Sequence, residues 1–412
     1  MRKMKDSDIE WIGEIPEEWR LIRLRFLCDI MTGNKDTVDN EPDGLYPFYV
    51  RSPIVERINS YSYDGEAILI AGDGVGAGKV FHYVNAKFEY HQRVYNLHNF
   101  KQIKGKFLYY YLKENFYKEI ERGSAKNTVD SIRLHMLQNY IVPCPIDSNE
   151  QLRIITYLDN KCEEINSVIT AKEITNEKLK EYRQSIIYET VTKGLDKNAP
   201  MKDSGIGWIG EIPETWVLKK LKFIGESIIG ITYSPDDITD SEGLLVLRSS
   251  NVQNGKMSYE DNVYVSKLIN EKLLVKKNDI LICSRNGSKG LIGKCALIDE
   301  KSVNSTFGAF MTIFRSEANR FIYYVFNSPI FSYHIGTFLT TTVNQLTINN
   351  LNNIVIPIPT KLGEQKQIAD YLDKKCAEID KVITANEKTI EKLKEYRQSI
   401  IYEAVTGKTE IV

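Results

Sequence analysis

Several features that would classify a protein quickly are scarce in this 412-residue sequence. No apolar run approaches the roughly 18 residues that a membrane-spanning helix needs, and the basic N-terminus lacks the apolar core of a secretory signal. The six cysteines are scattered, with no CxxC pair and no metal-type spacing to the five histidines. We therefore expect a protein of a reducing, cytoplasmic compartment, with no membrane partner and no metal site.

Catalytic signatures are missing as well. The sequence contains no nucleophile elbow, no HExxH pair, no Asn-Pro-Pro-Tyr motif of an amino-methyltransferase and no convincing nuclease arrangement of carboxylates and lysine. One segment, AILIAGDGVGAGKV at 67–80, matches a relaxed dinucleotide fingerprint and resembles a phosphate loop. The residues after it are aromatic and β-branched rather than helical, so no helix N-terminus would face a phosphate. We interpret the segment as a mobile Gly-rich loop between strands.

Charge is nearly balanced, at −1 for the whole chain. The balance differs along the sequence, because residues 20–145 hold 17 Lys and Arg against 14 Asp and Glu, and residues 217–359 hold 15 against 12. A polyanion such as DNA needs basic residues only where it touches the protein. The mild basic excess of these two stretches permits DNA binding there without requiring it.

A double internal repeat is the main feature that the sequence does contain. The segment DSDIEWIGEIPEEWRLIRLRF at 6–26 recurs as DSGIGWIGEIPETWVLKKLKF at 203–223, and we call these two the leading segments. Residues 150–192 recur at 364–406, with the run EKLKEYRQSIIYE unchanged. The stretches between these repeats resemble each other only faintly. A repeated frame around variable contents indicates two recognition heads on one scaffold.

Residues 150–192 and 364–406 are each predicted to form one long helix. Apolar residues recur at alternating spacings of three and four over about six heptads, which favours a coiled coil over an ordinary surface helix. Two such helices in one chain most simply pack on each other, although packing on a head or on another subunit would satisfy the same pattern. The polar seam residues Lys172, Asn176 and Asn386 would lower stability while fixing register and orientation.

The variable stretches have the pattern of mixed α and β structure. Short β-rich runs such as EAILIAGDG and DILICSRNG alternate with turns, and each stretch contains one aromatic-rich predicted helix, KGKFLYYYLKENFYKEIERG or NRFIYYVFNSPIFSYHIG. A proline-bounded strand, NYIVPCPI or NNIVIPIP, closes each stretch before the long helix. The predicted fold is α+β, with two similar heads, two long helices and an internal repeat. The predicted boundaries are 1–149 for the first head, 150–194 for the central helix, 195–205 for a linker, 206–363 for the second head and 364–412 for the distal helix.

Residue types that read DNA gather around the Gly-rich loop and around ILICSRNGSKGLIGKC, its counterpart in the second head. Arg pairs with guanine and Asn or Gln with adenine, whereas Lys, Ser, Thr and backbone N–H groups hold phosphates. The candidate DNA-contacting residues are Gly74, Gly76, Gly78, Lys79, Tyr90, His91, Gln92, Arg93 and Lys126 in the first head, and Arg285, Asn286, Ser288, Lys289, Lys294, Asn304, Thr306, Thr341, Asn344 and Gln345 in the second. We expect Lys79 and Lys294 to hold phosphates alike. For each candidate, an ordinary solvated loop residue remains the alternative.

Together these pieces resemble the specificity subunits of type I restriction–modification enzymes. The resemblance covers essentially the whole chain: the leading segments EEWRLIRLRF and ETWVLKKLKF, the helix starts VPCPIDSNEQLRIITYLD and IPIPTKLGEQKQIADYLD, and the Gly-Lys loops GAGKVFHYV and GLIGKCALI. The first helix start departs from the family pattern, because PIDSNEQ lacks the usual second proline and leucine before Glu-Gln.

The resemblance implies a non-catalytic subunit that reads DNA. In that family two target-recognition domains are held apart by an antiparallel coiled coil, with a pseudo-two-fold relation between the halves. Each domain reads one half of a bipartite asymmetric site on double-stranded DNA. Two modification subunits would dock on the repeated helices, and restriction subunits carrying the motor and nuclease would join them. S-adenosylmethionine, ATP and Mg²⁺ are then expected on those partners, with no cofactor in this chain.

Two other functions stay open on the residues alone. A nucleotide-dependent hydrolase or a fused methyltransferase would reveal itself by cofactor binding to the isolated chain. A purely structural coiled-coil adaptor would show no DNA sequence preference, even with its partners present. The DNA-reading interpretation accounts for the duplication, the long helices and the missing catalytic motifs together.

Overall fold

The computed structural model describes residues 2–123, 131–338 and 344–411. The chain divides into two compact units: unit 1 is Met1–Lys172 with Glu387–Val412, and unit 2 is Glu173–Asn386. Both long helices, α3 (Ser148–Lys193) and α7 (Leu362–Val405), cross this division. Each unit therefore combines one head with one part of each helix, so the repeated helices are shared between the units.

Unit 1 begins with two small antiparallel strand pairs that contain its leading segment. The first is β1 (Met4–Asp6) with β2 (Glu14–Pro16), and the second is β3 (Arg20–Arg23) with β10 (Ile141–Cys144). Strand β10 is the last strand before α3, and it lies beside the leading segment. The chain thus returns from the head to the leading segment before the long helix begins.

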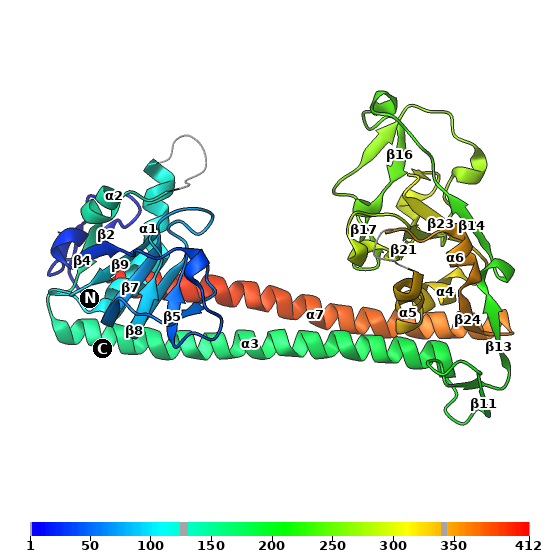
Figure 1. Cartoon of the computed structure of the whole chain (residues 1–412), viewed down its shortest axis with the longest axis horizontal. Helices are drawn as coiled ribbons and strands as arrows, with labels where there is room; N and C mark the ends of the chain where they lie inside the picture. The colour runs from blue at the N-terminus through cyan, green and yellow to red at the C-terminus, as the bar shows by residue number, and fades with distance from the viewer. Residues whose placement is uncertain (1, 124–130, 339–343, 412) are drawn as a thin grey trace. The chain divides into compact units, whose positions relative to one another are not determined.

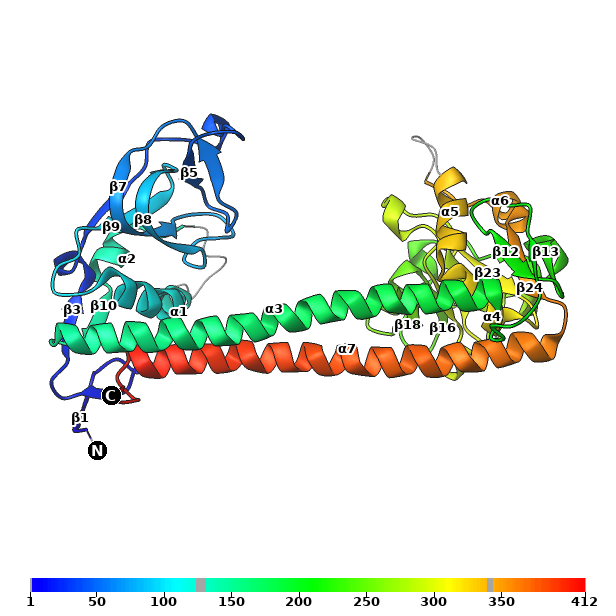
Figure 2. The same ribbon diagram turned by 90° about the horizontal axis from the view of Figure 1, so that it is seen from below.

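The head of unit 1 is built on a six-stranded sheet in the order β4-β9-β7-β8-β5-β6 (Figure 1). Its strands are β4 (Asp29–Thr32), β5 (Tyr46–Tyr49), β6 (Glu56–Ile58), β7 (Tyr63–Ala71), β8 (Phe81–Tyr90) and β9 (Val94–His98). All neighbours are antiparallel except β5 and β8. A helix, α1 (Gly105–Gly123), packs against β7 and β8 and lies between the sheet and α3 (Figure 2). A short helix, α2 (Leu134–Asn139), precedes β10.

Alternation along β7 places its side chains in two cores. Ile68 and Ile70 belong to the large core that contains Phe107 and Leu108 of α1. Ala67 and Leu69 belong to a smaller cluster on the other face of the sheet. Both faces of the central strand are therefore buried, which explains its continuous apolar run.

Unit 2 has the same strand pairs around its leading segment as unit 1, but its head is built differently. β11 (Met201–Asp203) pairs with β12 (Glu211–Pro213), and β13 (Trp216–Lys220) pairs with β24 (Val355–Pro359). The head contains two four-stranded sheets, in the orders β14-β23-β20-β21 and β15-β19-β16-β22, and a separate pair β17-β18. These strands are β14 (Glu226–Ile229), β15 (Ile238–Thr239), β16 (Leu244–Leu247), β17 (Val252–Gln253), β18 (Lys256–Met257), β19 (Val263–Val265), β20 (Ile280–Cys283), β21 (Cys295–Leu297), β22 (Thr306–Phe307) and β23 (Met311–Arg315).

The aromatic-rich segment of unit 2 forms two helices where the sequence predicted one. α4 (Asn319–Phe326) ends before Ser328, and α5 (Pro329–Phe338) begins at the proline. Proline lacks a backbone N–H and clashes with the preceding turn, so it begins a helix easily and interrupts one. A third helix, α6 (Ile348–Asn353), precedes β24. In unit 1 the corresponding predicted helix is continuous as α1.

A buried tryptophan ties each leading segment to the first turn of a long helix. Trp19 is fully buried and donates its indole N–H to Glu150 Oε1 at 3.1 Å. Trp216 is equally buried and donates to Glu364 Oε1 at 2.8 Å. A carboxylate is favourable at a helix N-terminus, and the indole supplies it with a further donor.

The glutamine after each of these glutamates bonds back to the proline-bounded strand. Gln151 Nε2 donates to the Pro145 carbonyl at 2.9 Å, and Gln365 Nε2 donates to the Pro359 carbonyl at 2.8 Å. The Pro…Glu-Gln pattern of the sequence is therefore a junction that fixes where each helix starts.

The two long helices pair antiparallel within each unit, as expected. In unit 1, Ile165 and Ile169 of α3 pack with Ile390 and Ile400 of α7. In unit 2, Arg183 Nε lies 3.6 Å from Asp380 Oδ1, and Asn386 Nδ2 donates to Asn176 Oδ1 at 2.8 Å. Residue numbers rise along one helix as they fall along the other.

Asn176 and Asn386 were predicted to be polar seam residues, and they satisfy each other. A lone amide in such a seam would remain without a partner, so the pair favours the register in which both asparagines meet.

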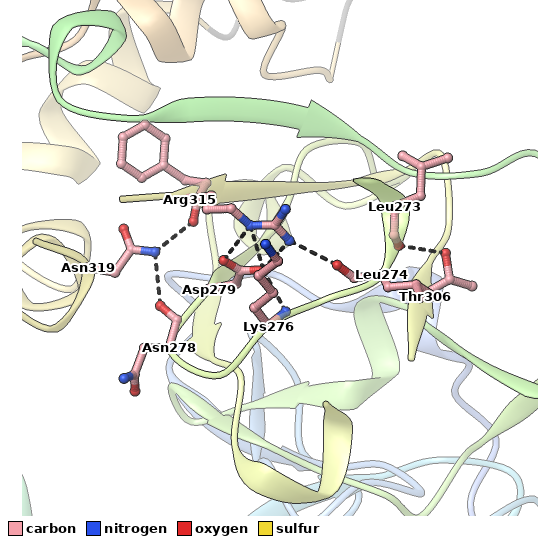
Figure 3. Close-up of polar contacts among 9 residues, drawn as sticks. Leu273, Leu274, Lys276, Asn278, Asp279, Thr306, Arg315 and Asn319 are labelled. Atoms are coloured by element: carbon pink, nitrogen blue, oxygen red, sulfur yellow. Dashed lines mark hydrogen bonds and ion pairs between the residues drawn. The ribbon is translucent and has the colours of Figure 1, made fainter. Parts of the chain in front are cut away.

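A buried charge pair of unit 2 lies just before β20 (Figure 3). Asp279 is 2% exposed and accepts hydrogen bonds from Arg315 Nε at 3.0 Å and Arg315 Nη2 at 2.6 Å. Asp279 also accepts from the Lys276 backbone N–H, and Arg315 donates to the Leu274 carbonyl. The pair joins β23 to the turn before β20 and closes one end of this head.

We predict that Asp279→Ala lowers the free energy of unfolding of unit 2 by roughly 3 kcal/mol, because it leaves a half-buried guanidinium without its partner. The matched control is Glu300→Ala, which removes an exposed ion pair with Lys277 and should cost about 1 kcal/mol or less. Denaturant unfolding gives the free energies, and hydrogen exchange locates the loss. Equal losses for the two variants, or loosening of unit 1, would contradict the assignment.

Candidate nucleic-acid interface

The Gly-rich loop of unit 1 follows β7 and has a fixed base. Gly72 N–H donates to the Arg93 carbonyl at 2.8 Å, and Ile132 N–H donates to the Gly72 carbonyl at 2.6 Å. The loop is therefore attached on one side to the turn between β8 and β9 and on the other to the segment before α2. Sequence segments 72–79, 91–93 and 131–132 meet at this end of the sheet.

The Gly-Lys sequence shared by the two heads has a packing explanation. Gly78 has φ +64°, and a Cβ there would lie 2.5 Å from Ile120 Cδ1 of α1. Gly293 has φ +85°, and a Cβ there would lie 3.1 Å from Ile335 Cγ1 of α5. Glycine is required in both places by the left-handed backbone and by close approach to a helix. Packing within each head is therefore sufficient to explain the shared glycine.

The lysines that follow these glycines have different surroundings. Lys79 is exposed, and its Nζ lies 4.4 Å from the ring centroid of Tyr117. Lys294 Nζ donates to the Val252 carbonyl at 3.0 Å, and burial lowers the pKa of Lys294. Only Lys79 is free to reach a phosphate without first breaking a hydrogen bond inside its head. The expectation that the two lysines act alike therefore stays a prediction, although their surroundings differ.

Two arginines of unit 1 meet one aspartate at the base of the Gly-rich loop. Arg51 Nη1 lies 3.1 Å from Asp73 Oδ1, and Arg93 Nε lies 3.7 Å from Asp73 Oδ2. Gln92 donates through Nε2 to Asp36 beside them. The predicted residues Gln92 and Arg93 therefore lie together, whereas Arg51 was missed because it stands more than 20 residues before the loop in sequence.

Tyr90 and His91 are corrections, because their side chains are buried. Tyr90 is 4% exposed within the smaller core of the head. His91 is 2% exposed, and its Nδ1 accepts from the Arg93 backbone N–H at 2.9 Å. Burial lowers the pKa of His91, which favours the neutral ring. Both residues support the turn that carries Gln92 and Arg93, and neither presents its side chain to DNA.

In unit 2 the predicted candidates gather at the end of β20. The backbone of Arg285 bridges to Gln345, and Leu346 N–H donates to the Ser284 carbonyl at 2.7 Å. Asn344 Nδ2 donates to the Gly287 carbonyl at 3.3 Å. The segment 344–346 therefore lies along 284–287, which brings Asn344 and Gln345 beside Arg285, Asn286 and Ser288.

An exposed phenylalanine that sequence reasoning missed completes this group. Phe310 is 60% exposed, and the Arg285 guanidinium carbon lies 5.3 Å from its ring centroid. The Phe310 carbonyl accepts from the backbone N–H groups of Ser284 and Arg285. A cation stacked on an exposed ring presents a flat surface suited to nucleobases. Lys289, also exposed, follows in the same loop.

Thr306 and Asn304 do not join this group. Thr306 is fully buried, and its hydroxyl donates to the Leu273 carbonyl at 3.1 Å (Figure 3). Asn304 is exposed at a turn with φ +68°, and its N–H donates to the Val275 carbonyl. Both contact the segment that precedes β20, at the opposite end of that strand from Arg285. Thr306 is thus a correction. Lys126 and Thr341 lie outside the described residues.

Metal-binding groups, reactive cysteines and membrane-spanning helices can be checked directly in the described residues. Across 2–123, 131–338 and 344–411, no group of three His, Cys, Asp or Glu side chains is placed to bind a metal ion. The six cysteines are buried as free thiols, and burial raises the pKa of Cys28 and Cys295 to about 12. In the same part of the chain, no helix has both the length and the apolar character to span a bilayer.

Comparison with known proteins gives one consistent match. The family model for the type I restriction modification DNA specificity domain matches twice, over 16–183 and 213–395. The MjaVIII type I restriction enzyme specificity subunit of Methanocaldococcus jannaschii is 27% identical over 96% of this chain and 94% of its own length. The EcoKI specificity subunit of Escherichia coli is 32% identical over 48% of this chain and 44% of its own length.

Solved structures agree on the fold. A chain from a structure of a type I R-M system superposes with a TM-score of 0.72 at 16% identity, covering 96% of this chain and 99% of its own. The HsdS subunit of Thermoanaerobacter tengcongensis superposes with a TM-score of 0.50, also at 16% identity, covering 96% and 98% of the two chains. Two α+β heads joined to two long helices are therefore an arrangement already seen in solved proteins.

We predict that the salt dependence of DNA binding separates the lysines. Lys79→Ala and Lys289→Ala should each reduce the slope of log affinity against log salt by about 0.9, because each removes one phosphate contact. Lys294→Ala should leave the slope unchanged and instead lower the stability of unit 2 by roughly 1 kcal/mol, since the Val252 carbonyl loses its donor. Titrations at several salt concentrations measure the slopes. A reduced slope for Lys294→Ala would show instead that Lys294 contacts a phosphate.

Proposed function

We propose a division of labour within this chain, which belongs to the family of type I restriction–modification DNA specificity subunits. Each head reads one half of a bipartite, asymmetric site in double-stranded DNA and thereby directs methylation and restriction by partner subunits. The observation that carries this proposal is the repeat itself: the same leading segment, closing strand and helix start surround two different heads.

The two candidate surfaces support different half-sites. In unit 1 the exposed groups are Gln92 and a pair of arginines around Asp73. In unit 2 they are Arg285, stacked on the exposed Phe310, with the half-buried Asn286 beside it. Bidentate Arg and Asn or Gln contacts distinguish guanine from adenine in the major groove. Because the two sets differ in composition and in the elements that carry them, the two halves of the site would differ in sequence.

We further propose that this chain is not catalytic and acts in the cytoplasm, where its DNA is found. At the two candidate surfaces the described residues bring together arginine, aspartate, glutamine and asparagine side chains, and arginine, glutamine and asparagine are the kinds that hydrogen-bond base edges. S-adenosylmethionine would be bound by modification subunits, and ATP and Mg²⁺ by the restriction subunits. This chain would supply the DNA specificity, and other subunits would supply the chemistry. Exchange of a head would then change the DNA sequence that is recognised without changing the reaction.

The paired helices provide a surface for those partners. On each helix, the residues that immediately precede alternate seam residues form a stripe of the same types in the same order: Lys161, Val168, Thr175, Tyr182 and Glu189 on α3, and Lys375, Val382, Thr389, Tyr396 and Glu403 on α7. We call this stripe the g flank, after its heptad position. Val168 and Tyr396 are 45% and 54% exposed in unit 1, and Val382 and Tyr182 are 47% and 57% exposed in unit 2.

The opposite flank of each helix pair is covered by a head. In unit 1, Asp159 of α3 accepts from Tyr110 at 2.6 Å, and Ile401 of α7 is buried in the head core. In unit 2, Asp373 accepts from Tyr324 at 2.5 Å, and Ile187 is buried likewise. The heads therefore leave the g flank as the open apolar side of each pair.

We propose that one modification subunit docks on the g flank of each unit. Exposed Tyr and Val rimmed by charged residues have the composition of an interface core and rim. The stripe is the same on both helices, so two copies of one partner would bind equivalently. Restriction subunits would then join through that assembly.

Exchange of one head tests the function. We predict that replacing residues 27–140 with the head of another family member changes only one half of the recognised sequence, because β3 and β10 close the exchanged stretch within unit 1. The reciprocal exchange of 224–354 should change only the other half. Methylation of a randomised DNA library by the reconstituted complex reads both halves at once. A single exchange that altered both halves would refute independent reading.

Charge placed on the g flank tests the partner surface. We predict that Tyr182→Glu in unit 2 reduces the number of bound modification subunits from two to one, since a buried carboxylate without a partner is strongly unfavourable at an interface. Ile174→Glu is the matched control: Ile174 is 51% exposed on the same helix but lies off the g flank. Native mass spectrometry of the complex counts the subunits. Two bound subunits with Tyr182→Glu, or loss with Ile174→Glu, would exclude this surface.

A further inference from the structure

An acidic residue, Asp73, lies between two arginines of the candidate surface of unit 1, where its charge would repel DNA phosphates. Asp73 stands at the base of the Gly-rich loop, between the guanidinium groups of Arg51 and Arg93. Its side chain is 23% exposed, whereas those of Arg51 and Arg93 are 45% and 66% exposed. The arginines are thus the outer groups and the carboxylate is the inner one.

The backbone holds Asp73 firmly in this place. Asp73 bridges to Ser131, and the preceding Gly72 is hydrogen-bonded on both its N–H and its carbonyl side. Gly76 passes so close to Arg51 that a Cβ would lie 2.4 Å from the Arg51 carbonyl oxygen. Three segments, around residues 51, 73 and 93, are therefore locked together at one end of the sheet. The carboxylate is thereby held in place, where it accepts a hydrogen bond from Arg51 Nη1 at 3.1 Å and lies within ion-pair distance of Arg93 Nε, at 3.7 Å.

We propose that Asp73 is the positioning residue of this half-site and that Arg51 is a base-reading residue beside Arg93. The inference rests on the proposed DNA-reading function. A carboxylate that accepts from part of a guanidinium fixes its plane, and the remaining N–H groups can then address a base edge. The same negative charge repels phosphates, so it weakens contacts that carry no sequence information.

This role has a signature that a purely structural role lacks. Loss of Asp73 frees two arginines and removes one negative charge from the DNA-facing surface. Non-specific affinity should therefore rise, and the salt dependence should steepen by about 0.9 for each arginine that gains a phosphate contact. Preference within the half-site read by unit 1 should fall roughly tenfold, within the range for a lost bidentate base contact. A residue needed only for folding would lower both kinds of affinity together.

The test compares variants of the full chain in its complex with modification subunits. Asp73→Ala and Asp73→Asn should both raise non-specific affinity and relax one half-site, and the Asn variant preserves side-chain volume if the Ala variant fails to fold. Arg51→Ala should relax preference at one base pair, and adding it to Asp73→Ala should have little further effect. Asp64→Ala is the matched control, because Asp64 is an exposed aspartate near the other end of β7. Binding to a randomised DNA library at two salt concentrations gives all readouts.

The outcomes separate this inference from the proposed function. If the unaltered complex shows no sequence preference in either half-site, the proposed function fails. If it shows both half-sites and Asp73→Asn leaves the first unchanged, only the positioning role fails. Parallel loss of specific and non-specific affinity in the Asp73 variants would also overturn it, as would an equal effect of Asp64→Ala.

Discussion

The structure depends on the junction at which each head returns to the shared scaffold. A buried indole donates to a glutamate in the first turn of a long helix, and the next residue, a glutamine, bonds back to the proline strand that closes the head. Leaving any of these buried groups unpaired would cost about 1–3 kcal/mol. The junction therefore fixes the point at which a variable stretch ends and a helix begins. Any head whose two ends meet at this point can be accommodated, and the two heads here show how different such stretches can be.

Both candidate surfaces are formed by loops held on strand ends. In unit 1 the turn before β9 supports the Gly-rich loop, and in unit 2 the segment before α6 lies along the loop after β20. Side chains carried by such loops can differ widely while the strands beneath them stay in place. The Gly-Lys similarity between the heads belongs to the supporting layer, since Gly78 and Gly293 pack on helices. The side chains that would read two different DNA half-sites lie outside this supporting layer.

The helix pair of each unit has two unlike flanks. One flank is covered by the head through buried isoleucines and tyrosine–aspartate hydrogen bonds. The other carries a repeated stripe of exposed Tyr and Val. A helix that supports a head on one side and keeps an apolar stripe on the other is suited to join recognition to a partner. This arrangement gives a physical reason for the repetition of the helix sequence: the same surfaces are needed twice.

Features that depend on local pattern could be predicted from the amino-acid sequence. Periodicity predicted α3 and α7, the repeat predicted two heads, and β-branched runs predicted strands such as β7 and β20. The asparagine seam also follows from spacing alone. The break between α4 and α5 was visible in Pro329 but was not predicted. The grouping of the candidate residues at a site, in contrast, depends on how distant segments fold together. Arg51 and Phe310 lie at their sites because of contacts between distant segments. Burial removes the side chains of Tyr90, His91 and Thr306 from the surface, and Lys294 bonds a distant carbonyl. Exposure and long-range contact depend on how distant segments pack, and no local pattern encodes them.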